Sequence, residues 1–63
     1  MDYGALISQV RGGVITTHQA VEQVAYYMWE WTQGHRDALT NWYAALTSLR
    51  NYCALRNIDI AWD

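Results

Sequence analysis

Two apolar stripes of helical period, one on each side of Gly34, constrain this fold more than any other feature. Before the glycine, steps of three and four residues link Val21, Val24, Met28 and Trp31. After it, the same steps link Leu39, Trp42, Leu46, Leu49 and Cys53. A helix with this spacing presents one apolar face. The sequence therefore predicts two helices that reverse near Gly34 and pair in layers: Trp31 with Leu39, Met28 with Trp42, Val24 with Leu46, and Val21 with Leu49.

Capping residues predict where these helices begin and end. Asp2 fits the N-cap of a short first helix, and Gly12-Gly13 ends it because glycine accepts the left-handed conformation. Thr16 and Gln19 have the spacing of a capping box, in which each side chain binds the other residue's backbone N–H. We therefore expect the first long helix to run from about Thr17 to Gln33.

The second long helix is expected from about His35 or Arg36 to Arg56. Beyond it the period changes to two, with Ile58, Ile60 and Trp62 alternating with polar or small residues. That pattern is typical of a strand, or of an extended arm laid across the helices. The predicted class is all-α: an antiparallel helical hairpin with a short N-terminal helix and an extended C-terminal tail. Sixty-three residues fit one domain, residues 1–63.

The apolar arcs of the two long helices are wider than one contact between them needs. On a helical wheel they cover roughly 200° and 180°, where a single packing stripe takes little more than about 100°. Three of the four Trp and four of the five Tyr residues lie on these two helices. One interpretation is a three-element core with some half-exposed aromatics. The other is a protein interface, for which the candidates are Tyr26, Tyr27, Trp29, Trp31, Trp42, Tyr43, Arg50 and Trp62.

Arg50 is the charged member of that set, and it lies inside the apolar arc of its helix. Its aliphatic stem can cover the core while the guanidinium reaches water. Alternatively, the guanidinium pairs with a carboxylate of a partner and anchors the interface. The sequence leaves both interpretations open.

Composition excludes several classes of protein and partner. A net charge of −2 with four cationic residues argues against nucleic acid, whose binders present a clustered basic face. The chain lacks an apolar run of the roughly 18 residues that a membrane span needs. The lone Cys53 cannot form an intrachain disulfide, which together with the absence of a signal-like start indicates a cytoplasmic setting. A place within a virion or another large assembly is compatible with these features.

The side chains that carry catalysis or bind metals do not form a recognisable pattern. His18, His35 and Cys53 are the soft ligands, but only His18 and Cys53 are expected to lie close together, and a metal site needs more ligands. Glu22 and Glu30 belong to the solvent face of their helix. We expect no metal, no cofactor and no enzymatic activity.

With these classes of function disfavoured, we expect the chain to bind protein. The primary prediction is a subunit that self-associates or packs into a larger protein assembly through its Trp/Tyr-rich helix faces. The alternative is a small regulator or inhibitor, of the kind that phages encode, that binds and blocks a host protein. A helix-turn-helix DNA-binding protein is less favoured, because the helix that would read the bases carries Glu22 and Glu30 and no Arg or Lys.

Overall fold

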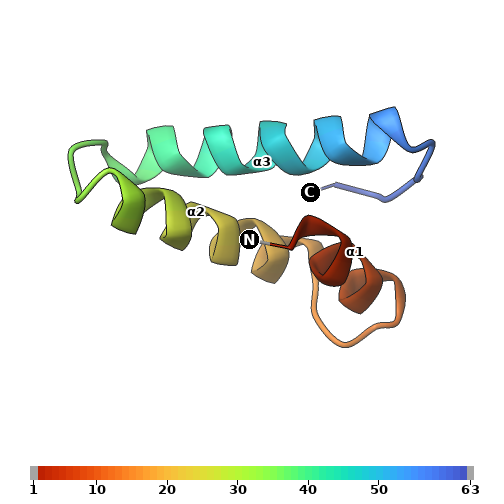
Figure 1. Cartoon of the computed structure of the whole chain (residues 1–63). Coiled ribbons are helices and arrows are strands. Elements are labelled where there is room, and N and C mark those ends of the chain that lie inside the picture. Colours follow the sequence, from red (N-terminus) through yellow and green to blue (C-terminus); the bar gives the residue numbers. More distant parts are fainter. Residues whose placement is uncertain (1, 63) are drawn as a thin grey trace.

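A computed structural model describes residues 2–62 and forms three helices. They are α1 (Tyr3–Arg11), α2 (Thr17–Trp31) and α3 (Ala38–Leu55), joined by short loops (Figure 1). The all-α prediction is confirmed. No strand forms anywhere in residues 2–62, so the strand interpretation of the tail is wrong.

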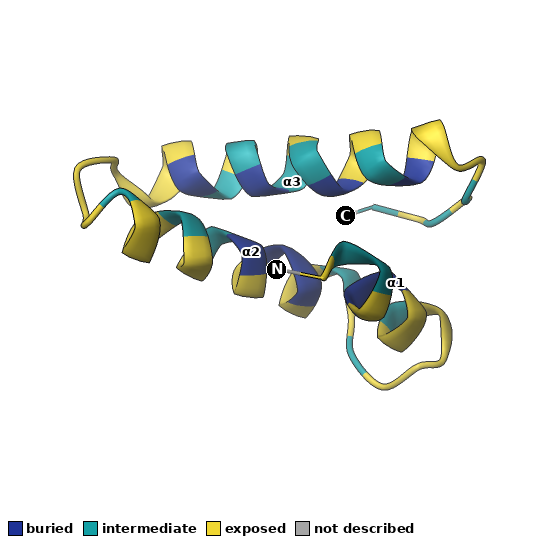
Figure 2. Cartoon of the chain, viewed as in Figure 1, coloured by how far each residue is buried: buried dark blue, intermediate teal, exposed yellow. Residues whose placement is uncertain are grey.

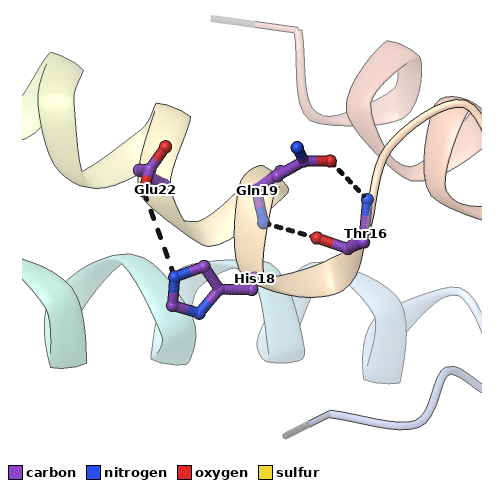
Figure 3. Close-up of polar contacts among 4 residues, drawn as sticks. All are labelled: Thr16, His18, Gln19 and Glu22. Carbon is purple, nitrogen blue, oxygen red and sulfur yellow. Dashed lines mark hydrogen bonds and ion pairs between the residues drawn. The ribbon is translucent and has the colours of Figure 1, made fainter.

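Local hydrogen bonds explain where α1 and α2 begin. The Asp2 carboxylate accepts the backbone N–H of Ala5 at 3.1 Å, as its N-cap role requires. The predicted capping box is confirmed: Thr16 Oγ1 accepts the backbone N–H of Gln19 at 3.0 Å, and Gln19 Oε1 accepts that of Thr16 at 2.9 Å (Figure 3). These contacts satisfy backbone donors that the first helical turn leaves free.

The loop between α2 and α3 is longer than the sequence indicated. α2 ends at Trp31, because Gln33 and Gly34 both adopt positive φ, 56° and 76°. α3 begins at Ala38 rather than near His35, because Asp37 is its N-cap and accepts the backbone N–H of Thr40 at 2.7 Å. The predicted boundaries here therefore err by two to three residues.

α3 runs back alongside α2, and α1 packs against the opening part of α2 (Figure 1). The buried hydrophobic side chains form one cluster along this contact (Figure 2), and they are Leu6, Ile7, Ala20, Val21, Val24, Ala45, Leu49 and Cys53. Ala20 and Ala45 are completely buried. Small side chains at a helix contact let the two backbones approach closely, and two of the eight residues of this cluster are alanines.

The predicted layers between the long helices are partly wrong. The buried positions of α3 follow steps of four, through Asn41, Ala45, Leu49 and Cys53. Trp31 and Leu39, predicted to form one layer, are 83% and 63% exposed. The Trp42 ring packs against the His18 ring, with centroids 4.6 Å apart. Packing along the row with steps of four turns the larger side chains of the apolar stripe towards the edges of the contact.

α1 and the tail cover only the half of the α2/α3 pair that lies away from the loop (Figure 1). The Tyr3 ring meets the Tyr52 ring edge-on, with centroids 5.8 Å apart. A Cβ atom at Gly4 would lie 3.0 Å from the Tyr52 hydroxyl, which explains a glycine inside α1. On the tail, Ile58 and Trp62 are partly buried and pack against the core cluster.

Candidate protein-interaction surface

The half of the α2/α3 pair next to the loop extends beyond the ribbons of α1 and the tail (Figure 1), and we call residues 26–43 the distal end. Tyr3 of α1 still shares a shallow groove with Tyr27 and Trp31, and Trp62 of the tail shares a small hollow with Trp42. Figure 2 shows most of this end as exposed. Its exposed large apolar side chains are Tyr26, Tyr27, Trp29, Trp31, Leu39 and Tyr43. Exposed large apolar side chains gathered at one end of a molecule are typical of a protein-binding site. Six of the eight candidate interface residues fall within residues 26–43, and five of them are exposed.

A shallow groove on α2, with a volume of about 570 Å³, combines aromatic and acidic side chains. Its lining consists of Glu22, Gln23, Tyr26, Tyr27 and Glu30. The two tyrosine rings stand nearly perpendicular, 78°, with centroids 6.4 Å apart. The hydroxyl of Tyr26 donates to the Glu30 carboxylate, and this bond raises the pKa of Tyr26. Exposed tyrosine faces beside carboxylates suit a cationic group.

A second groove lies between α2 and α3 and has a volume of about 320 Å³. Asn41 forms part of its lining together with Ala25, Trp29, Ala38 and Trp42. The Trp29 ring rests against the loop, since a Cβ at Gly34 would lie 3.3 Å from it.

Asn41 is the buried polar residue of this groove. It is 2% exposed, and neither Oδ1 nor Nδ2 has a hydrogen-bond partner in the structure. Buried amides are normally hydrogen-bonded, so a buried amide with neither polar atom paired is unusual and requires an explanation. Asn41 was not among the predicted site residues. Its place four residues before Ala45 puts it in the buried row of α3, which a stripe of apolar residues alone does not indicate.

The other three predicted interface residues are not exposed apolar side chains of the distal end, although Trp42 lines the second groove beside Trp29. Trp42 and Trp62 are partly buried and line a small hollow with His18. Arg50 is exposed on α3 beside Thr47 in a separate shallow groove. Trp42 and Trp62 thus contribute to the core as well as to its edge.

The titratable groups that could carry chemistry are dispersed. No three His, Cys, Asp or Glu side chains come together to hold a metal within residues 2–62. His18 pairs with Glu22, Nε2 to Oε2 at 4.0 Å, on the exposed face of α2 (Figure 3). Burial raises the pKa of the Cys53 thiol, which favours its neutral form over the thiolate.

Comparison of the chain with protein families, curated proteins and solved structures finds no match. Among the described residues, no helix is both long and apolar enough to cross a membrane.

Proposed function

We propose that this chain is a non-enzymatic protein-interaction module, a subunit that self-associates or packs into a larger protein assembly through its distal end. In this proposal α2 and α3 form an antiparallel hairpin, and the tail is an extended arm that braces the half away from the loop. The hairpin is the rigid support, and the aromatic residues at its free end are the contact surface.

The observation that carries the proposal is the uneven covering of the α2/α3 pair. Two helices alone cannot bury wide apolar arcs on both, and a third layer is needed. The ribbons of α1 and the tail supply that layer over the half away from the loop (Figure 1), and only the side chains of Tyr3 and Trp62 reach towards the other half within residues 2–62. At the other end Trp31 is 83% exposed and Trp29 and Tyr26 are at least half exposed. Burying one such side chain against a partner contributes about 1.5–3 kcal/mol, and aromatic residues are enriched among interface anchors.

A regulator that blocks a basic surface of another protein is the second candidate, and the groove on α2 favours it. Glu22 and Glu30 flank Tyr26 on a helix that carries no Arg or Lys. Over residues 2–62, no arginine forms an ion pair with either carboxylate. An arginine of a partner would meet both carboxylates and an aromatic face there. The same groove repels phosphate, which counts against nucleic acid.

The test places a photoreactive amino acid at Trp31 and, as a control, at Leu55. Both side chains are more than 80% exposed, but Leu55 lies at the far end of α3. We expect cross-links to a defined protein, or to a second copy, from position 31 and none from position 55. Trp31→Ala should weaken the same association, whereas Leu55→Ala should leave it unchanged. Equal labelling from both positions, or none from either in the cell of origin, would refute the proposed function.

A further inference from the structure

The charged side chains of the distal end indicate which partner it takes. Asp37 is engaged within the chain, because its carboxylate accepts the backbone N–H of Thr40 as the N-cap of α3. Glu30 and Arg36 are both exposed, and within residues 2–62 neither of them forms an ion pair. We propose that the distal end binds the distal end of a second copy of this chain about a two-fold axis, with Glu30 of each copy paired to Arg36 of the other. This inference rests on the proposed function and specifies its partner.

The placement of these two charges makes the surface complementary to itself. Glu30 lies one residue before the end of α2 and Arg36 lies two residues before the start of α3, so both flank the loop. In a two-fold interface every contact between two different residues occurs twice, with the copies exchanged. One unpaired anion and one unpaired cation at the same end therefore give two ion pairs. A surface with charges of a single sign would instead repel its own copy.

Both side chains have bonding capacity left for a partner. The Glu30 carboxylate accepts the hydroxyl of Tyr26, and a carboxylate has further acceptor sites on both of its oxygens. The guanidinium of Arg36 has a fork of N–H donors that fits a carboxylate. By contrast, Arg56 is engaged within the chain, since its guanidinium lies 3.8 Å from the centroid of the Tyr52 ring.

The apolar side chains beside the two charges are already accessible. An exposed ion pair contributes little to affinity by itself. In this interface the burial of apolar side chains supplies the affinity, and the two ion pairs fix the register and the choice of partner. These side chains are each more than half exposed, so a second copy reaches them without any change in the fold: Tyr26, Tyr27, Trp31 and Leu39.

The area of the distal end is sufficient for a dimer. A stable interface removes about 800 Å² from each partner, which is roughly a fifth of the 4448 Å² surface of this chain. Residues 26–43 make up more than a quarter of the chain. All of them are exposed except Met28, Thr32, Asn41 and Trp42.

The first experiment measures self-association by sedimentation equilibrium from low micromolar to near-millimolar concentration, where we expect a monomer–dimer equilibrium for the wild type. Glu30→Arg and Arg36→Glu should each raise the dissociation constant by about tenfold, because two attractive pairs become two repulsive ones. The chain that carries both substitutions regains both pairs and should dimerise like the wild type. Arg50→Glu is the matched control: it reverses an exposed arginine of α3 outside the distal end and should leave the dissociation constant unchanged.

The second experiment mixes the two single variants, one labelled with a donor fluorophore at its N-terminus and the other with an acceptor. Each like-charged contact becomes an oppositely charged one in the mixed dimer, so energy transfer should appear in the mixture at concentrations where neither variant dimerises alone. Circular dichroism should show wild-type helix content for both variants, because both positions are exposed.

The outcomes separate this inference from the proposed function. A wild type that is monomeric at every concentration overturns the inference and leaves the cross-linking from position 31 to decide the function. Cross-links from position 31 to a different protein alone overturn the second copy and support the proposed function. A dimer that Arg50→Glu weakens equally, or whose single variants do not associate on mixing, overturns the pairing of Glu30 with Arg36 while supporting self-association. A dimer that each single reversal weakens and that the mixture restores supports the inference.

Discussion

Replacing Asn41 with leucine is expected to stabilise the free chain. The side chain is 2% exposed and its two polar atoms have no partner. Leaving a buried polar group without a hydrogen bond destabilises the fold by about 1–3 kcal/mol, whereas an apolar side chain of similar size carries no such penalty. Leucine should therefore raise the free energy of unfolding by about 1 kcal/mol or more, after a small penalty for its different shape. In a domain of this size each kcal/mol shifts Tm by about 4–8 °C.

The assay is urea unfolding followed by circular dichroism, at a concentration where the wild type is monomeric. The midpoint should rise with the slope m unchanged, because the surface exposed on unfolding stays the same. Asn41→Ala is the control: it removes the amide but leaves a cavity, so it should gain less than leucine or lose stability. A lower midpoint for Asn41→Leu would show that the amide is satisfied in the free chain, and the reasoning would fail.

Three further changes test the local structure. Thr16→Ala removes one half of the capping box and should cost about 1 kcal/mol in urea unfolding; an unchanged midpoint would mean that water caps the helix equally well. Gly34→Ala should cost at least about 1 kcal/mol, because φ is 76°. It should cost more than Gly13→Ala, which has the same φ but open space where Gly34 meets the Trp29 ring; equal losses would exclude a role for the ring. The pKa of Asp37 is lowered by the backbone hydrogen bond at the start of α3, so its stabilisation is full above the unfolded value of 3.8 and is lost as the pH falls through the folded value. Asp37→Asn should flatten that acid dependence of the urea midpoint, and a parallel loss in both proteins would contradict the assignment.

Much of the local structure could be predicted because it depends on neighbours in the chain. Thr16 and Gln19 lie three residues apart and form their capping box without help from the rest of the fold. The contact between α2 and α3 could not be predicted in the same way. The apolar stripe favoured Trp31 and Leu39 at the seam, but the structure buries Ala45 instead. Which row of a helix packs is decided by how closely two backbones can approach, and that depends on both helices together.

The candidate site was likewise predictable from the sequence only in part. The width of the apolar arcs predicted surplus aromatic surface, and the structure exposes Trp31, Tyr26 and Tyr43 at one end. Asn41 was missed because a polar residue between apolar ones normally lies on the solvent side of a helix. Only the three-dimensional contact shows that this amide is buried without a partner.

The uneven covering of the α2/α3 pair also implies uneven local stability. Opening the half beneath α1 and the tail disrupts the core cluster, whereas most side chains of the loop end are already exposed, apart from Asn41, Met28 and Trp42. Backbone amides near Met28 and Ala38 should therefore exchange with solvent through local opening, while those near Val21 and Leu49 should exchange only through global unfolding. A molecule that binds the loop end also suppresses its local opening, and the cost of that ordering reduces the net binding free energy. Binding and ordering of the loop end are then coupled, and adding a partner should slow amide hydrogen exchange there.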